Sequence, residues 1–195
     1  MENKKGAFIV ISGPSGVGKN TIADVLVDKG YGIYSVSMTT RGIREGEKEG
    51  RDYFFVSKEE FDRNIEEGNF LEYARYGDNY YGTLKSYVFD NLNNGINVIA
   101  VVDIQGGVNI ENLFPEAVLI FIMPPSYEEL EKRLRGRGTD SEEAILKRLD
   151  IAKKEMEFSS HYDYIVINNT VDRATEDIID IIDKEVIKIN ENHYY

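Results

Sequence analysis

Residues 13–19, GPSGVGK, match the pattern G-x-x-x-x-G-K, in which a glycine-rich turn leads to a lysine. Glycines let the backbone curl so that successive N–H groups point at phosphate oxygens, and a following helix adds the partial positive charge of its N-terminus. In such a loop the lysine reaches the β- and γ-phosphates. The pattern therefore predicts a site for a nucleoside triphosphate. Its expected residues are Gly13, Pro14, Ser15, Gly16, Val17, Gly18, Lys19, Asn20 and Thr21.

The metal partner of this loop departs from the usual pattern. The position after Lys19 usually carries Ser or Thr, whose hydroxyl contacts Mg²⁺, but here it is Asn20, with Thr21 next. Asparagine offers a carbonyl oxygen and no hydroxyl, so we expect magnesium contact through Asn20 or Thr21, in part through water. Asp103 follows an apolar run and is a second candidate. It could hold a magnesium-bound water or contact an acceptor nucleotide, and the sequence leaves both open.

A second group of residues is suited to holding another phosphate. Arg41 and Arg44 lie three apart in SMTTRGIR, and arginines that converge on one phosphate form bidentate, charge-assisted bonds. The segments RDY, at residues 51–53, and NYYGT, at residues 79–83, add phenols and a hydroxyl. An exposed tyrosine cluster alone is typical of a packing surface. Beside a phosphate loop, the group indicates a second phosphate site that faces the first.

Short apolar runs indicate the strands that must position these residues. Runs at residues 7–12, 97–102, 118–123 and 164–168 are apolar at nearly every position, as strands buried on both faces require. Helical spacing follows the phosphate loop at residues 21–29, and S-x-x-E capping boxes begin at Ser57 and Ser126. An isoleucine stripe over residues 178–189 predicts an amphipathic helix that packs on the core. The expected class is α/β, a parallel sheet with helices on both faces.

Two segments do not fit this alternation. Residues 37–87 are rich in tyrosine, glycine and charge, with strand-like pieces around one helix, and residues 126–157 are charged and helical with an interruption at GRG. We expect a single domain over residues 1–195 in which both segments are inserted into a core formed by residues 1–36, 88–125 and 158–195.

Composition limits the possible functions. The 195 residues include 23 basic and 35 acidic side chains, for a net charge of −12 and a pI near 4.7, which disfavours binding to nucleic acid or to a membrane surface. There is no cysteine and there are only two histidines, so cysteine chemistry is excluded and a histidine metal site is disfavoured. The opening apolar run is too short for a signal peptide and no run approaches 18 residues, so we expect a soluble intracellular protein. The oligomeric state is left open.

In their order and spacing, several segments resemble guanylate kinases: ISGPSGVGK, SVSMTTR-x-x-R, EGRDYFFVS, FLEYARYGDNYYGT, VDIQG, PPSYEELEKRLRGRGT and KRL. The resemblance spans residues 8–169. It implies the P-loop nucleoside monophosphate kinase fold, with residues 37–87 as the GMP-binding lobe and residues 126–157 as a helical lid over ATP. It also implies transfer of phosphate from Mg²⁺-ATP to GMP, with dGMP as a second substrate, in cytoplasmic purine metabolism.

The resemblance further implies roles for individual residues. Glu72 and Ser37 would read guanine, because one carboxylate can accept the adjacent N1–H and N2–H donors of guanine, whereas N1 of adenine is itself an acceptor. Val101 stands where relatives often carry an acid, which predicts a weaker hold on the guanine amino group. The resemblance also implies that the GMP phosphate is bound by Arg41, Arg44, Tyr53 and Tyr81, and that Thr83 and Asp103 contact the GMP nucleotide. On the ATP side it implies that the donor and acceptor phosphates are bridged by Arg133, Arg137 and Arg148, and that Asn168 contacts adenine.

Three other functions are less compatible with the sequence. A kinase for a ribose bisphosphate would share the scaffold, but Glu72 and the pair Tyr80 and Tyr81 favour a pocket that reads a base. A non-catalytic binding module of the same family typically has a degraded phosphate loop, whereas Lys19 is present here. A GTPase switch requires N/T-K-x-D to read its base, and the sequence contains none.

Overall fold

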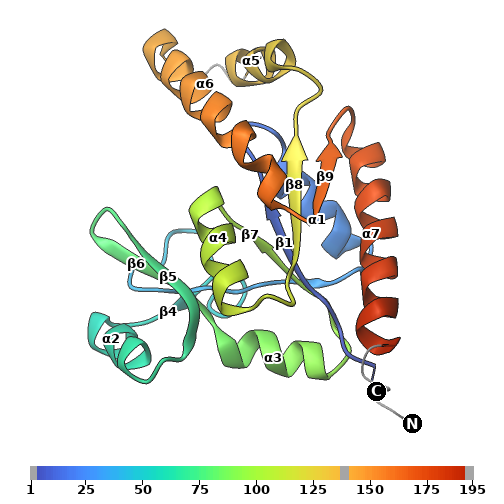
Figure 1. Cartoon of the computed structure of the whole chain (residues 1–195). Coiled ribbons are helices and arrows are strands. Elements are labelled where there is room, and N and C mark those ends of the chain that lie inside the picture. The colour runs from blue at the N-terminus through green and yellow to red at the C-terminus, as the bar shows by residue number, and fades with distance from the viewer. Residues whose placement is uncertain (1–3, 137–140, 192–195) are drawn as a thin grey trace.

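The computed structural model describes residues 4–136 and 141–191, and its centre is a five-stranded sheet in which every neighbouring pair is parallel. The strand order is β2-β7-β1-β8-β9, so the first long strand lies in the middle (Figure 1). The strands are β1 (Phe8–Ser12), β2 (Ile33–Tyr34), β7 (Val98–Val101), β8 (Val118–Met123) and β9 (Tyr164–Ile167).

Alternate side chains of β1 enter two cores, one on each face of the sheet. Ile9 and Ile11 pack in the core under α1 (Lys19–Asp28) and α7 (Val171–Glu191). Phe8 and Val10 pack in the other core, which α3 (Lys85–Asn93) and α4 (Ile104–Leu113) cover through Val88, Leu92 and Ile110. A strand buried on both faces has no polar face, which explains why β1 is apolar at every position before Ser12. The predicted α/β class with helices on both faces is confirmed.

A second, smaller sheet lies beside the core, at the lower left of Figure 1. An apolar cluster between this sheet and α2 (Lys58–Glu66) is centred on Phe61 of the helix. The Phe61 ring stacks on Phe70 with 4.6 Å between centroids. The Ser57 hydroxyl accepts from the Glu60 N–H at 3.2 Å and caps α2 as predicted. The strand order is β4-β3-β6-β5, with β3 (Met38–Thr39), β4 (Phe54–Phe55), β5 (Phe70–Tyr76) and β6 (Asn79–Leu84).

Two helices, α5 (Tyr127–Gly136) and α6 (Glu142–Glu157), form the segment that we call the lid, which lies beyond the carboxyl end of β8 (Figure 1). Ser126 accepts from the Glu129 N–H at 3.2 Å, so the predicted cap of α5 is present. The lid has its own small apolar cluster, and the 3₁₀ turn Phe158–His161 returns the chain to β9. The cluster contains Leu130, Leu134, Ile145, Leu149 and Ala152.

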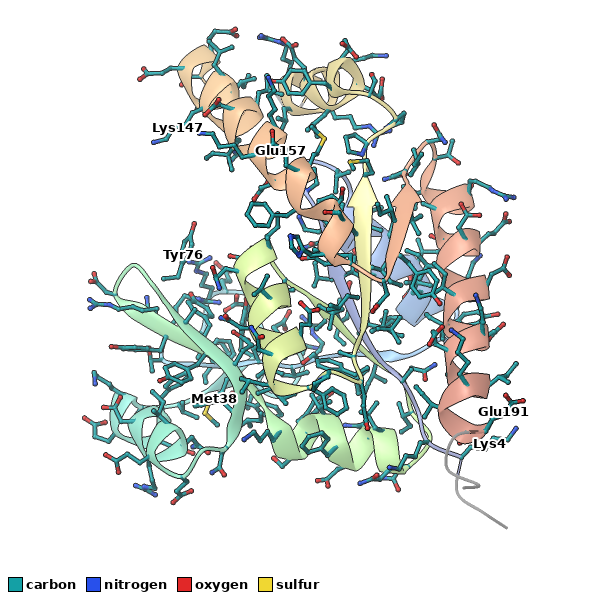
Figure 2. The ribbon with its side chains drawn as sticks, viewed as in Figure 1. Lys4, Met38, Tyr76, Lys147, Glu157 and Glu191 are labelled. Atoms are coloured by element: carbon teal, nitrogen blue, oxygen red, sulfur yellow. The ribbon has the colours of Figure 1, made fainter. Side chains whose placement is uncertain are left out.

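The two ends of the described chain meet at the opposite end of the sheet from the lid. Asn190 of α7 accepts from the Lys5 N–H at 2.8 Å and donates to the Lys5 carbonyl at 3.0 Å. Figure 2 labels Lys4 and Glu191 side by side in this region. Within the described residues, no helix is both long enough and apolar enough to cross a membrane.

Some elements differ from the prediction. The first helix begins at Lys19, two residues before its expected start, because Gly18 adopts a left-handed conformation and serves as its N-cap. Strands β2 and β3 have two residues each, too few for a periodic pattern. Helix α3 begins inside the segment predicted as an insertion and ends in the core, where Val88 is fully buried.

Candidate functional site

The phosphate loop connects β1 to α1 at the carboxyl end of the central strand. Gly13 has φ of 140°, and a Cβ there would lie 2.4 Å from the carbonyl oxygen of Ile122 on β8. Gly18 has φ of 100°, and a Cβ there would lie 2.7 Å from the Asn168 side chain. Side chains rarely adopt such φ values, so both the turn and its close neighbours require glycine here. The predicted strand, glycine loop and helix are therefore present in this order.

Lys19 folds back over this loop. Its Nζ donates to the carbonyl oxygens of Gly13, at 2.5 Å, and Pro14, at 3.2 Å. Lys19 is one of the residues that line a pocket that we call the P-loop pocket. The lining residues are Gly13, Ser15, Gly16, Gly18, Lys19, Asn20, Thr21, Asp103 and Glu155.

Asn168 supports the loop from behind. Its side-chain amide donates to the Val17 carbonyl at 2.7 Å, and the residue is only 3% exposed. The backbone carbonyl of Asn168 accepts from Arg133 of the lid at 3.0 Å, while Arg133 also pairs with Glu129 at 3.1 Å. Asn168 thus links the P-loop to the lid, a role that its position in the sequence did not indicate. The expected contact with adenine stays a prediction.

Asp103 lies between two pockets. It follows β7 and caps α4, where its Oδ1 accepts from the Gly106 N–H at 2.7 Å. It lines the P-loop pocket and also a second pocket, which we call the acceptor pocket. Both roles expected for Asp103 are compatible with this position. The acceptor pocket is lined by Tyr53, Glu72, Ala74, Tyr76, Tyr81, Val102, Asp103, Gln105, Gly106 and Asn109.

A half-buried carboxyl group lies in the acceptor pocket. Glu72 on β5 accepts from the Thr83 hydroxyl on β6 at 2.9 Å, across the antiparallel pair in which the two residues are opposite one another. Burial raises the pKa of Glu72, the Thr83 hydrogen bond opposes this, and the negative charge of Asp103 adds to it. Thr83 is 2% exposed, so Glu72 is held in one orientation by a hydroxyl that cannot turn to solvent.

Arg41 and two tyrosines meet at one side of this pocket. The Arg41 guanidinium lies over the Tyr53 ring, 5.3 Å from its centroid, and the Tyr53 and Tyr81 rings pack edge to face at 5.8 Å. A side-chain hydrogen bond between Tyr81 and Arg41 also helps to raise the arginine pKa. The largest contribution to that shift comes from Glu47, which pairs with both terminal nitrogens of Arg41 at 3.0 and 2.7 Å.

Three of the remaining predicted residues, Ser37, Arg44 and Arg148, are described by the structure but are not among the residues that line the two pockets. Arg44 is exposed, and its backbone N–H donates to Glu47 at 2.8 Å. The Ser37 carbonyl accepts from the Phe54 N–H at 2.9 Å, next to β3. Arg148 is half-buried on α6, whereas Arg137 lies outside the described residues. Val101 packs against the core under α1 and α7.

Two acidic residues, one paired with Arg41 and the other in the lining of the P-loop pocket, were not predicted from the sequence. Glu47 completes the spacing R-x-x-R-x-x-E that starts at Arg41, and this charge pattern was the available signal. Glu155 enters the P-loop pocket from the lid. It lies seven residues after Arg148, so the two share one side of a helix, but nothing local indicated that this side meets the loop.

A phosphate loop at the end of a central parallel strand defines the class of P-loop nucleotide-binding proteins. The acceptor pocket, which shares Asp103 with it, is the further feature that a phosphotransferase needs. Comparison with known proteins gives the family. The guanylate kinase family model matches residues 5–185, and the chain belongs to this family.

Individual relatives agree over nearly the whole chain. A guanylate kinase of Fusobacterium nucleatum is 53% identical over 182 residues, covering 93% of this chain and 98% of its own. One of Caldanaerobacter subterraneus is 50% identical over 190 residues, covering 97% and 92%. The crystal structure of guanylate kinase from Anaplasma phagocytophilum superposes with a TM-score of 0.71 at 35% identity, covering 95% and 88%.

Proposed function

We propose that this protein is a guanylate kinase that transfers the γ-phosphoryl group of ATP to the phosphate of GMP and, as a second substrate, of dGMP. The observation that carries the proposal is the pair of pockets that meet at Asp103, one formed by the P-loop and the other holding Glu72. A nucleotide in each pocket would bring donor and acceptor phosphates together. Both substrates are intracellular nucleotides, so we place the enzyme in the cytoplasm.

The donor side would bind Mg²⁺-ATP. Backbone N–H groups of the loop and the Lys19 ammonium suit phosphate oxygens. Asn20, Thr21 and Asp103 line the same pocket and offer carbonyl, hydroxyl and carboxylate oxygens, the hard donors that magnesium prefers. The residues therefore fit the ion, with Asn20 or Thr21 and Asp103 holding it partly through water. When bound, the ion neutralises charge on the phosphates.

The acceptor side would recognise GMP at both ends. Glu72, oriented by Thr83, would accept the paired N–H donors of guanine, with Ser37 nearby. Arg41, Arg44, Tyr53 and Tyr81 would bind the phosphate, since guanidinium groups and phenols donate hydrogen bonds to anionic oxygens. A buried carboxylate that meets the acceptor N1 of adenine stays unpaired, which costs roughly 1–3 kcal/mol or more. The same Glu72 pocket favours a base over a bare ribose phosphate.

The chemistry requires positioning and charge neutralisation more than covalent help. An oxygen of the GMP phosphate attacks the γ-phosphorus as the bond to the β,γ-bridging oxygen breaks, and ADP leaves with that electron pair. The attacking oxygen is already anionic, so no base is needed. Lys19 and the arginines Arg41, Arg133, Arg137 and Arg148 would neutralise the charge that develops. Closure of the lid would exclude water and so prevent simple hydrolysis of ATP.

The test is ADP production from Mg²⁺-ATP with GMP, dGMP, AMP, UMP, CMP and a ribose bisphosphate measured in parallel. We expect turnover with GMP and dGMP only. Lys19→Ala should lower kcat by about 1,000-fold or more, because it removes a charge from the transferring phosphate, while GMP binding stays within about twofold. Lys153→Ala, at an exposed lid position, is the matched control. Turnover confined to the ribose compound, or GMP binding without any turnover, would refute the proposal.

A further inference from the structure

A carboxylate of the lid lies in the P-loop pocket. Glu155 of α6 lines this pocket together with the P-loop, the start of α1 and Asp103. The side chain is half-buried, and its Oε2 is shielded from solvent with no hydrogen-bond partner among the described residues. A buried carboxylate oxygen without a partner is costly, so this position calls for an explanation beyond packing.

The groups around Glu155 are those that a phosphate would use. A hydrogen bond from the Ser15 backbone and the charge of Lys19 both lower the pKa of Glu155, whereas burial, the largest influence, raises it, and Asp103 adds to that rise. The net shift is upward, so the pocket stabilises the anion incompletely. A carboxylate is an anion with two acceptor oxygens, and at this place it resembles two oxygens of a phosphate group.

We propose that Glu155 is a residue of the donor site that competes with the nucleotide phosphates for the P-loop, so that nucleotide binding must displace it. The proposal rests on the function given above, in which this loop binds ATP. The Lys19 ammonium and the Ser15 N–H cannot bind a phosphate oxygen and the Glu155 carboxylate in the same position at the same time. The negative charge of Glu155 in the lining of the same pocket would also repel the phosphates.

Displacement of Glu155 would move the lid, because α6 is held as one body. Ile145, Leu149 and Ala152 pack its inner side against α5. Arg148 lies two turns before Glu155 on the same side of the helix. A shift of α6 that removes the carboxylate from the loop therefore carries this arginine with it. Glu155 in this way makes the position of Arg148 dependent on whether phosphate occupies the loop.

The experiment is calorimetric titration of the full chain with ADP, first without magnesium. If the carboxylate competes, Glu155→Gln removes a charged competitor, and we expect ADP to bind about tenfold more tightly than to the wild type. Glu157→Gln is the matched control, since Glu157 is an exposed glutamate of the same helix (Figure 2) and should bind as the wild type does. Equal affinity of Glu155→Gln and Glu157→Gln would overturn the proposal.

The same titration with Mg²⁺-ADP separates competition from metal binding. Competition predicts that the gain in Glu155→Gln persists with magnesium. A loss of affinity seen only with magnesium would overturn the proposal and place Glu155 around the ion. If Glu155→Gln does not melt cooperatively, Glu155→Asp replaces it, since a side chain shorter by one methylene should compete less and bind ADP more tightly than the wild type; unchanged affinity in this variant counts against the proposal.

Failure of the proposed function gives a different result. If the P-loop pocket is not the donor site, wild-type protein will not bind ADP, or Lys19→Ala will bind it as the wild type does. If the function holds and only the present inference fails, wild type binds, Lys19→Ala binds weakly and Glu155→Gln matches its control.

Discussion

Glu72, to which the proposed function assigns the recognition of guanine, lowers the stability of the free protein. Burial raises its pKa in the folded protein, so the folded state binds more protons than the unfolded state between the ordinary carboxyl pKa and the raised value. Stability therefore falls as the pH rises through this window, and the full cost is present above the raised pKa. A residue that destabilises the free protein while it lines a pocket is the pattern expected of a binding group.

Replacing this carboxylate tests both effects at once. Glu72→Gln should lower kcat/KM for GMP by about 100-fold, because a charged acceptor of two hydrogen bonds is lost. The same change should raise the melting temperature at pH 7, since the amide has no charge to desolvate. Glu66→Gln, at an exposed position, is the control. Unchanged GMP turnover in Glu72→Gln would remove Glu72 from base recognition.

The raised pKa of Glu72 also predicts a pH dependence. As the pH falls through that pKa, the carboxyl becomes protonated and loses an acceptor, so kcat/KM for GMP should fall on the acid side. The GMP phosphate titrates as well, but it does so in every variant. Glu72→Gln should retain only the phosphate contribution, and the difference between the two profiles, measured from pH 5 to 8, isolates Glu72. Identical profiles would contradict the assignment.

Glu47 acts through Arg41. It pairs with both terminal nitrogens of Arg41 and accepts from the Arg44 N–H, which holds the Arg41 guanidinium in place beside Tyr53. Glu47→Gln should raise KM for GMP about fivefold or more and leave kcat nearly unchanged, because an oriented charge-assisted pair becomes a weaker one. Glu45→Gln, exposed two residues earlier, should have no effect. A lowered KM would instead mean that Glu47 competes with the substrate.

At the scale of elements, the long periodic pattern of isoleucines in α7 determines which side of the helix packs on the core. Ile178 is fully buried and Ile182 is 1% exposed, in the core under α1, whereas Ile187 is 57% exposed. The isoleucine stripe was visible in the sequence because its spacing repeats over several turns of a helix.

This stripe predicts a contrast between two similar substitutions. Ile178→Ala should lower the free energy of unfolding by about 3 kcal/mol, since it removes buried methylenes and leaves a cavity. Ile187→Ala should change it by less than about 0.5 kcal/mol. Urea denaturation followed by circular dichroism measures both, and comparable losses would show that the helix packs on a different side.

The contrast between local patterns and contacts over long sequence distances explains which parts of the site could be predicted from the sequence. The P-loop was predictable because its function is encoded in seven consecutive residues whose glycines have to adopt positive φ. Strands β2 and β3 were not, because two residues carry no period. The Glu72 and Thr83 contact requires the β5–β6 register, and the approach of Glu155 to the P-loop requires the path of the whole lid; both depend on contacts between segments far apart in sequence.

At the scale of the whole molecule, the apolar clusters are unequal. The two cores on either side of the main sheet are large, whereas the lid cluster has five buried residues and the second sheet is centred on Met38, Phe61 and Phe70. Small clusters bury less apolar area and open more readily.

Hydrogen exchange should reveal this order. We expect amides of β1 and β8 to exchange only by global unfolding, and amides of α5 and α6 to exchange at least about 100-fold faster by local opening of the lid. Mass spectrometry of peptides from the labelled protein measures both. Equal protection in the lid and in β1 would show that the lid opens only when the whole domain unfolds.

The hydrogen bonds between Lys5 and Asn190 have a practical consequence. Because the two ends of the described chain meet at the end of the sheet away from the lid, they can be joined by a short peptide without strain, and new termini can be opened elsewhere. The exposed turn at Gly77 and Asp78, between β5 and β6, is a suitable place. A fluorescent protein inserted at this turn would test whether nucleotide binding moves β5 and β6, and a change in its signal would make the scaffold a sensor of its own nucleotides.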